Sequence, residues 1–442
     1  MKKKLLLCSF LAAILAMGLI LSTGILFAGP SAAGANEKLS AAPVLFDKEG
    51  KLNDRYLADA AAWINDHFFG RQELISMNNR LSALLFGTSG NDSVILGKDG
   101  WLYYASTLDN YTGENTMTHR ELFSAANNLR LMAAYCESQG KDFAFMIAPN
   151  KNSLYPEHMP NYGVISSVHD AQKLHKLLDQ MEVPYVDLFT AFRAEEETLY
   201  FATDSHWHSK GAALGADLIN AAFGVKSSYY HSDFGNSADY TGDLYEMLYP
   251  AFSGTEQQPI YAGELNFTYS GNATRPDSIT LQTKGQGESN LLCYRDSFGN
   301  LLYPYLAYSY ADSRFSRSNT YDLTLDADHV LIELVERNLR YLITYAPVMP
   351  SPATQMALPK SYAGAAEVSH APKARAPKGY DAWTGILPTA DDHAKAYLLW
   401  DGQCYEAFLL ENGAFTVYLP ENATAEALVI RSGDTTQVYT IS

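Results

Sequence analysis

The sequence has 442 residues, of which 47% are apolar, so it can form one large domain or two to three smaller ones around a substantial core. Its 32 basic and 49 acidic residues give a formal charge of −17. Because such a balance repels phosphate backbones, nucleic acid is a poor candidate partner. The 30 Tyr, 20 Phe and 5 Trp serve mainly as packing residues, although aromatic faces also suit contact with sugars.

The N-terminus has the pattern of an export signal. Lys2, Lys3 and Lys4 precede an apolar run from Leu5 to Ala28, and about 20 apolar residues suffice to span a bilayer. Ala33-Gly34-Ala35 resembles a cleavage site for a signal peptidase. We therefore predict that residues 1–36 are a signal peptide or a membrane anchor, and that the rest of the chain is extracytoplasmic, either anchored or secreted.

Cysteine usage excludes a disulfide-stabilised scaffold. Beyond the apolar run there are three cysteines, an odd number at no metal-like spacing: Cys136, Cys293 and Cys404. At most one bridge is predicted among them.

The first elements after the apolar run are helices and a hairpin. Leu52–Phe86 has the periodicity of one or two amphipathic helices, as expected of a membrane-proximal segment. Residues 94–104 then predict two short strands around a Lys98-Asp99-Gly100 turn.

Strands and helices alternate in the next part of the chain. The predicted elements are helices near 120–138 and 168–181 and strands at 143–148, 185–188, 291–294 and 329–335. This alternation predicts an α/β fold with a parallel sheet flanked by helices, and sites in such folds gather at the carboxyl ends of the strands.

The C-terminal part differs in composition. Repeated prolines between 346 and 378 predict a linker after a domain that spans 37–345. Residues 379–442 predict a small all-β module that binds glycan in one interpretation, with five short strands at 396–400, 405–410, 415–419, 427–431 and 437–441.

The most informative segment is Asp204-Ser205-His206-Trp207-His208, directly before a helical run at 212–223. An Asp and a His two residues apart can face each other, so that the carboxylate orients the imidazole and stabilises its protonated form. A serine nucleophile would complete a triad, because its hydroxyl needs an adjacent base. Ser297 is the candidate, since it lies between an apolar strand and a helical run, where backbone N–H groups at the helix start can stabilise an oxyanion.

These motifs together resemble one family. Asp204-x-His206-Trp207, Arg295-Asp296-Ser297-Phe298 and Ala148-Pro149-Asn150-Lys151 are similar to motifs of the alginate O-acetyltransferase (AlgX/AlgJ) family and its DHHW-type relatives, which are exported, SGNH-hydrolase-like proteins. The Gly97–Leu102 segment and Glu336-Arg337-Asn338 add to the resemblance, which covers roughly residues 50–345.

The resemblance implies that Ser297, His206 and Asp204 are catalytic and that Ser297 carries an acetyl group, which a hydroxyl of an extracellular polysaccharide then accepts. It also implies a membrane-bound O-acyltransferase as the donor of acetyl groups, and neither a metal nor a diffusible cofactor. Arg295 stands where ordinary SGNH enzymes have Gly, and the separate Gly and Asn blocks of those enzymes are not identifiable. The Ser297 N–H is therefore the first oxyanion donor that we predict, and the second is open among Asn150, Arg337 and Asn338. Trp207 joins them as a candidate for substrate binding.

Other functions stay open at this point. A carbohydrate acetylesterase would use the same triad with water as the acceptor. If residues 204–208 were a strand, Asp204, His206 and His208 would share a face and could bind zinc with His231, as in a metal-dependent deacetylase. A non-catalytic, glycan-binding envelope protein is the third class.

Each candidate residue also has a structural interpretation. Asp204 is suited to cap the following helix, and Ser297 to form a turn. Glu336 and Arg337 are predicted to form a surface ion pair, and Lys151 to be solvated.

Overall fold

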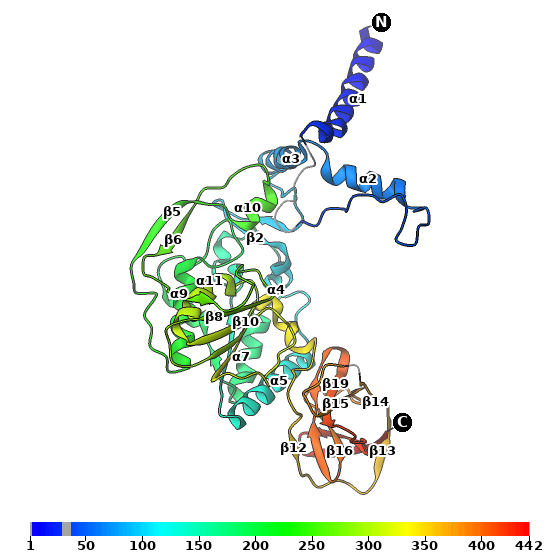
Figure 1. The fold of residues 1–442 in the computed structure, drawn as a ribbon, viewed down its shortest axis with the longest axis vertical. Coiled ribbons are helices and arrows are strands. Elements are labelled where there is room, and N and C mark those ends of the chain that lie inside the picture. The colour runs from blue at the N-terminus through cyan, green and yellow to red at the C-terminus, as the bar shows by residue number, and fades with distance from the viewer. Residues whose placement is uncertain (1, 29–36, 373, 442) are drawn as a thin grey trace.

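The computed structural model describes residues 2–28, 37–372 and 374–441. The predicted cleavage site at Ala33–Ala35 lies outside these residues. The N-terminal helix α1 (Lys2–Ala28) stands apart from the body, and its Leu7–Ile25 stretch is long and apolar enough to cross a membrane (Figure 1). Two further helices follow at its base, α2 (Tyr56–His67) and α3 (Arg71–Phe86), in agreement with the predicted helical segment.

A hairpin of β1 (Val94–Leu96) and β2 (Leu102–Tyr104) precedes the main sheet, as the turn residues predicted. At the turn, Asp99 and Gly100 have positive φ angles of 56° and 82°, a conformation that glycine adopts at no steric cost.

The central sheet has seven strands in the order β4-β3-β11-β9-β10-β8-β7. The strands β4, β3, β11, β9 and β10 pair in parallel, whereas β8 pairs antiparallel with β10 and β7 pairs antiparallel with β8 at one edge. The sheet is therefore mixed, where the sequence predicted parallel strands. The sequence did not indicate this edge, because β7 and β8 are short and polar and lack the apolar run that marks the other strands. The strands are β3 (Asp142–Ala148), β4 (Tyr185–Val186), β7 (Thr268–Tyr269), β8 (Thr280–Lys284), β9 (Leu291–Tyr294), β10 (Asp312–Ser316) and β11 (His329–Val335).

Helices cover both faces of this sheet. Side chains alternate along β3, so that Phe145 and Ile147 pack in one core while Met146 and Ala148 pack in the other. The first core is closed by α5 (His119–Ser138), α7 (Asp170–Gln180) and η3 (Glu336–Ile343), and the second by α8 (Leu188–Ala194), α9 (Ser209–Ala222) and α11 (Gly299–Ser309). The remaining short helices are η1 (Ala105–Thr107), α4 (Leu108–Thr112), α6 (Lys151–Leu154), η2 (Pro156–His158) and α10 (Asp243–Leu248).

A two-stranded hairpin lies outside the central sheet. It consists of β5 (Phe234–Tyr240) and β6 (Glu256–Tyr261), with α10 in the connection between them. The hairpin runs along one side of the body (Figure 1).

The C-terminal part consists of strands in two sheets, of six and four strands. Three of them, β12 (Ala353–Thr354), β13 (Tyr362–Ala366) and β14 (Val368–His370), lie in the segment predicted as a linker, because their backbone groups pair with later strands. The others are β15 (Tyr380–Ile386), β16 (Lys395–Trp400), β17 (Gln403–Glu406), β18 (Phe408–Leu409), β19 (Ala414–Pro420), β20 (Ala427–Ser432) and β21 (Thr435–Ile441), with η4 (Glu411–Gly413) between β18 and β19.

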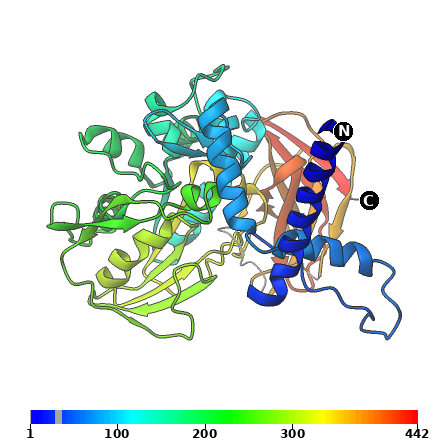
Figure 2. The ribbon, with the colours of Figure 1, turned by 90° about the horizontal axis from the view of Figure 1, so that it is seen from above.

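These sheets are joined to the α/β part through α5. The Asn128 amide donates to the Leu409 carbonyl and accepts from the Leu409 N–H, at 2.8 and 2.9 Å, and Arg130 forms an ion pair with Glu406. The C-terminal strands lie at the end of the body opposite the base of α1 (Figure 1), and Figure 2 shows them behind α1 when the molecule is seen from above.

Candidate active site

Three neighbouring strands of the central sheet end at the same edge, and the loops that follow them carry the site. Asn150 follows β3, Ser297 follows β9, and Arg337 follows β11. Ser297 stands in the turn that leads directly into α11, as the strand-to-helix pattern predicted.

Asp204, His206 and Ser297 lie in a hydrogen-bonded row. His206 Nδ1 is 2.8 Å from Asp204 Oδ1, and His206 Nε2 is 2.9 Å from Ser297 Oγ. Residues 91 positions apart are thereby brought within reach of proton transfer. The row has the geometry of a nucleophile, a base and the carboxylate that orients the base.

The Asp204 carboxylate is buried and held by several donors. It accepts hydrogen bonds from the backbone N–H of His206, the Tyr240 hydroxyl and the Asp243 N–H, at 2.9, 2.7 and 2.8 Å. Burial by itself raises the pKa of Asp204, but the hydrogen bond and charge of His206, with these further donors, hold it below its ordinary value. Asp204 is therefore ionised and fixed in place.

The environment of His206 favours the imidazolium. Burial lowers its pKa, but the hydrogen bond and charge of Asp204 and the charge of Asp243 outweigh burial, and the net pKa is raised. Asp243 Oδ2 is 3.6 Å from His206 Nδ1 and also accepts a 2.7 Å hydrogen bond from the Ser205 hydroxyl. Burial and the charge of Asp204 raise the pKa of Asp243 in turn.

Two charged side chains hold the loop on which Asp204 stands. The buried Lys151 ammonium donates to the carbonyls of Phe201, Ala202 and Asp204 at 3.1, 2.8 and 2.6 Å. Glu256, from β6, accepts from the backbone N–H groups of Ala202 and Thr203. Lys151 was predicted to be solvated; it is buried instead because three carbonyls of a sharply folded loop need donors.

The turn around Ser297 is fixed by the neighbouring Asp296. Its carboxylate accepts from the backbone N–H groups of Phe298 and Val335, at 3.0 and 2.8 Å, and from the Asn338 amide at 2.7 Å. A Cβ at position 299 would lie 2.3 Å from Arg295 Cδ, so Gly299 lets the Arg295 side chain pass. Through its hydrogen bond to Asp296, the Asn338 amide supports the turn.

The other residues predicted around the site have distinct environments. Trp207 is fully buried, and its indole N–H donates to the Phe298 carbonyl at 3.1 Å. Its ring packs against other aromatic rings, so no face of it is open to a sugar. The prediction that Trp207 contacts substrate is therefore wrong. Arg337 stacks on the rings of Phe298 and Tyr104, with its guanidinium carbon 5.5 and 5.4 Å from their centroids. The buried Asn150 amide has no hydrogen-bond partner among the described residues.

The predicted ion pair of Glu336 with Arg337 does not form. Glu336 is buried and accepts hydrogen bonds from the Asn150 N–H and the Ser153 hydroxyl, at 3.1 and 2.6 Å, while Arg337 faces the aromatic rings. Burial raises the pKa of Glu336 to about 7. Adjacent residues of a short helix point in different directions, which keeps the two charges apart.

The predicted zinc set is not assembled. Residues 204–208 form a loop, and His208 points away from it: its Nε2 is 2.6 Å from the Thr198 carbonyl and its Nδ1 accepts the Gly211 N–H at the start of α9. His231 is exposed. Asp243 lies beside Asp204 and His206 instead, and these three side chains could offer ligand atoms within 4.8 Å of one another, but each already has hydrogen-bond partners in the protein.

Sequence reasoning missed Tyr240, Asp243 and Glu256. They belong to the β5–β6 hairpin and to α10, where no motif or apolar period marks them. Of the residues that support Asp204, only Lys151 stands in a quoted motif, where it directly follows Asn150.

Comparisons with known proteins agree with this architecture. Residues 94–276 match the family model described as an SGNH hydrolase-like domain, acetyltransferase AlgX. This part of the chain is therefore similar to an AlgX-type domain. The chain is 28% identical over 223 residues to a probable alginate O-acetylase AlgJ of Pseudomonas syringae pv. tomato, a match that covers 47% of this chain and 55% of the relative. The chain thus spans about half the length of this curated relative.

Two solved structures are similar in part. Bacillus cereus PatB1 with a sulfonyl adduct has 18% identity and a TM-score of 0.42, covering 56% of this chain and 95% of that one. The O-acetyltransferase domain of Pseudomonas putida AlgJ has 19% identity and a TM-score of 0.37, covering 56% and 92%. The AlgX model includes Asp204, His206 and the hairpin residues that support them, whereas Ser297 follows the matched range.

Proposed function

We propose that this protein is an exported O-acetyltransferase that acetylates an extracellular polysaccharide through a Ser-His-Asp triad. The observation that carries the proposal is the row in which the His206 imidazole bridges the Asp204 carboxylate and the Ser297 hydroxyl. The likeness to an AlgX acetyltransferase model and to a probable alginate O-acetylase supports the class of reaction.

The reaction runs in two displacements. In the first, His206 Nε2 takes the proton of Ser297 Oγ, which attacks the acetyl carbonyl, and the proton then passes to the leaving group. In the second, His206 takes the proton of a sugar hydroxyl, whose oxygen attacks the acetyl-serine. The proton returns to Ser297 Oγ as the acetyl group leaves it. Asp204 keeps the imidazole in one orientation and stabilises the imidazolium throughout.

The oxyanion of each tetrahedral intermediate needs donors. The Ser297 N–H at the start of α11 is the first that we propose. We propose the Asn150 amide as the second, because it follows β3 at the same edge of the sheet, one strand away from β9, and its buried N–H groups lack partners among the described residues. Asn338 is committed to Asp296, which leaves it less suited to this role.

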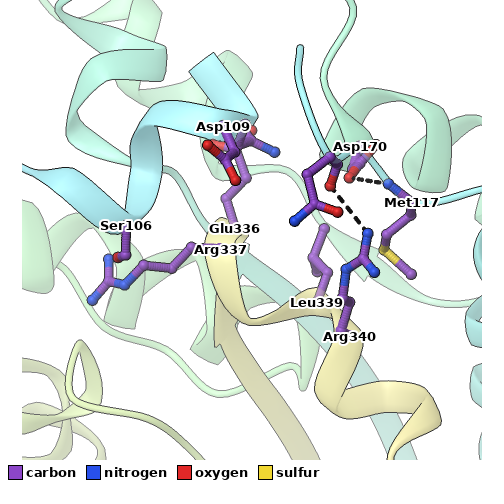
Figure 3. Close-up of a pocket in the computed structure, with 10 residues that line it drawn as sticks. Ser106, Asp109, Met117, Asp170, Glu336, Arg337, Leu339 and Arg340 are labelled. Atoms are coloured by element: carbon purple, nitrogen blue, oxygen red, sulfur yellow. Dashed lines mark hydrogen bonds between the residues drawn. The ribbon is translucent and has the colours of Figure 1, made fainter. Parts of the chain in front are cut away.

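A polar cavity of about 220 Å³ beside the site is the proposed place of the acceptor. Figure 3 shows Glu336, Arg337 and Arg340 on one segment of its wall and Asp109 on another. Arg337 also contacts Phe298, the residue after the nucleophile, so a group bound at this guanidinium lies close to the acetyl-serine. Typical ligand pockets are roughly 300–1,000 Å³, so this one suits a single sugar ring.

The remaining assignments are proposals of the same kind. Helix α1 acts as a signal peptide or anchor and places residues after 36 outside the cytoplasm. A membrane-bound O-acyltransferase supplies the acetyl groups. Residues 37–345 form the catalytic domain, and 379–442 a β-module suited to glycan binding.

The test uses the full chain with an activated acetyl ester, with and without oligosaccharide acceptors. We expect an acetyl group on Ser297 by mass spectrometry, acetylated oligosaccharide as product, and neither in Ser297→Ala. Ser232→Ala is the matched control, because Ser232 is exposed and its hydroxyl donates to the Ser228 carbonyl, away from His206. Acetate release that ignores every acceptor would indicate an esterase, and undiminished transfer by Ser297→Ala would refute the triad.

A further inference from the structure

Helix α3 packs on the body with its polar side chains and exposes its apolar ones. Ser76 Oγ accepts the Ala251 N–H at 2.9 Å, and the Asn79 amide donates to the Leu248 carbonyl at 2.8 Å. Both side chains are buried. The core-facing side of a surface helix is ordinarily its apolar side, so α3 is inverted relative to the usual pattern.

The exposed side of α3 is a continuous apolar stripe. At about 100° per residue the stripe is roughly 100° wide and lies opposite Ser76 and Asn79. Leu81 is 53% exposed, Leu84 78% and Leu85 65%. The stripe consists of Leu74, Met77, Leu81, Leu84 and Leu85, and we call it the α3 stripe.

Exposure of large apolar side chains is concentrated in this part of the molecule. Among the described residues after α1, thirteen such side chains lie in the 43 residues 44–86, and nine in the 354 described residues that follow. Soluble surfaces rarely keep so dense an apolar patch uncovered, which indicates that something other than water contacts it.

The position of α3 relative to α1 identifies what covers the stripe. The Phe69 N–H donates to the Leu21 carbonyl of α1 at 3.0 Å, and a Cβ at Gly24 would lie 2.5 Å from Phe69 Cβ. Phe69 therefore contacts the last turns of the apolar span, and α3 begins two residues later. Figures 1 and 2 show α3 beside the base of α1.

We infer that the α3 stripe lies in the outer interface of the lipid bilayer that α1 enters, and holds the catalytic body against the membrane. An interfacial helix buries its apolar face in the headgroup and acyl boundary while its polar face stays outside. In α3 the polar face packs against the protein, and the apolar face is directed away from it. Because α3 begins beside the end of the apolar span of α1, a bilayer that holds α1 would offer apolar contact to the α3 stripe.

This arrangement ties the site to the membrane surface. Leu248 and Ala251, which α3 contacts, end or follow α10, and α10 begins at Asp243 beside His206. Six helical residues rise about 9 Å, so a short rigid element separates the interfacial helix from the proposed triad. The inference rests on the exposed face, on its place beside α1 and on the proposed role of α1 as an anchor, and it is independent of the acetylation chemistry.

The experiment measures depth in the bilayer with spin labels on the full chain in phosphatidylcholine vesicles. Cys8→Ser removes the exposed thiol, and the three other cysteines are buried. One variant then carries Leu84→Cys, and its matched control carries Ile386→Cys, an apolar residue on β15 that is 58% exposed and belongs to the C-terminal sheets. Circular dichroism verifies that both variants keep the fold.

We expect the label at position 84 to show a several-fold higher ratio of oxygen to nickel-chelate accessibility than the label at 386. Equal ratios at the two positions would overturn the inference. Spin–spin broadening between labels at position 84, lost on dilution with unlabelled chain and accompanied by water-like accessibility, would also overturn it and assign the stripe to a second copy.

Discussion

Replacing Lys151 by Met tests whether a buried ammonium holds the loop of the site together. Lys151 Nζ donates to three carbonyls of residues 201–204, at 2.6 to 3.1 Å, and lies over the rings of Trp101 and Tyr103. Methionine matches the stem in length and offers no donor. The Ala202 carbonyl keeps the Leu102 N–H as a donor, so the variant leaves two buried acceptors, the carbonyls of Phe201 and Asp204, without the ammonium.

The magnitude follows from two opposing contributions. Each unpaired buried carbonyl costs about 1–3 kcal/mol, which gives roughly 2–6 kcal/mol for two. Removal of a buried charge returns several kcal/mol, since burial penalises the ammonium. We expect Lys151→Met to lower the free energy of unfolding by about 1–3 kcal/mol near pH 7. Acetyl transfer should fall further, because Asp204 loses its fixed position.

The pH dependence has a definite sign. Burial lowers the pKa of Lys151 to about 7, against an ordinary value of about 10.4 in the unfolded chain. Between these pH values the unfolded state binds a proton that the folded state does not, so stability rises with pH there. The difference between wild type and Lys151→Met should be constant below pH 7 and grow toward pH 10.

Urea denaturation of the detergent-solubilised full chain, followed by circular dichroism from pH 6 to 10, measures both effects. Lys98→Met is the matched control: Lys98 is exposed, so its loss should change the free energy of unfolding by less than about 0.5 kcal/mol. If Lys151→Met were as stable as Lys98→Met across this range, the reasoning about the two carbonyls would be refuted.

Three further predictions concern the carboxylates around His206. Asp243→Asn removes a charge that raises the pKa of His206. The rising limb of the pH–rate profile reports the neutral imidazole, so it should move to lower pH. Asp239→Asn, which changes an exposed carboxylate of β5, should leave this limb in place. Tyr240→Phe removes a 2.7 Å hydrogen bond to an ionised carboxylate and should destabilise the fold by about 1.5–3 kcal/mol in urea denaturation, and an unchanged midpoint would argue against that bond. Asp204→Asn should lower kcat about 10⁴-fold with the fold retained, and a loss of less than tenfold would show that Asp204 does not orient the imidazole.

The sequence by itself determined many of the elements and indicated the residues of the row formed by Asp204, His206 and Ser297. The apolar periods placed β3, β9, β11 and most of the helices, because alternation and amphipathicity are local properties of the chain. Asp204 and His206 were recognisable because they stand two residues apart before a helix, and Ser297 because it stands between a strand and a helix.

Only the tertiary structure decided how these groups are supported. Tyr240, Asp243 and Glu256 reach the Asp204 loop from a hairpin and a helix 36 to 54 residues away, and hydrogen bonds across such separations leave no pattern in sequence. Lys151 could be judged solvated from its charge, yet the folded loop surrounds it with carbonyls. The same holds for the mixed edge of the sheet, the strands in the proline-rich segment and the outward face of α3. Each depends on which surfaces pack together in the folded chain, and no short stretch of sequence shows this.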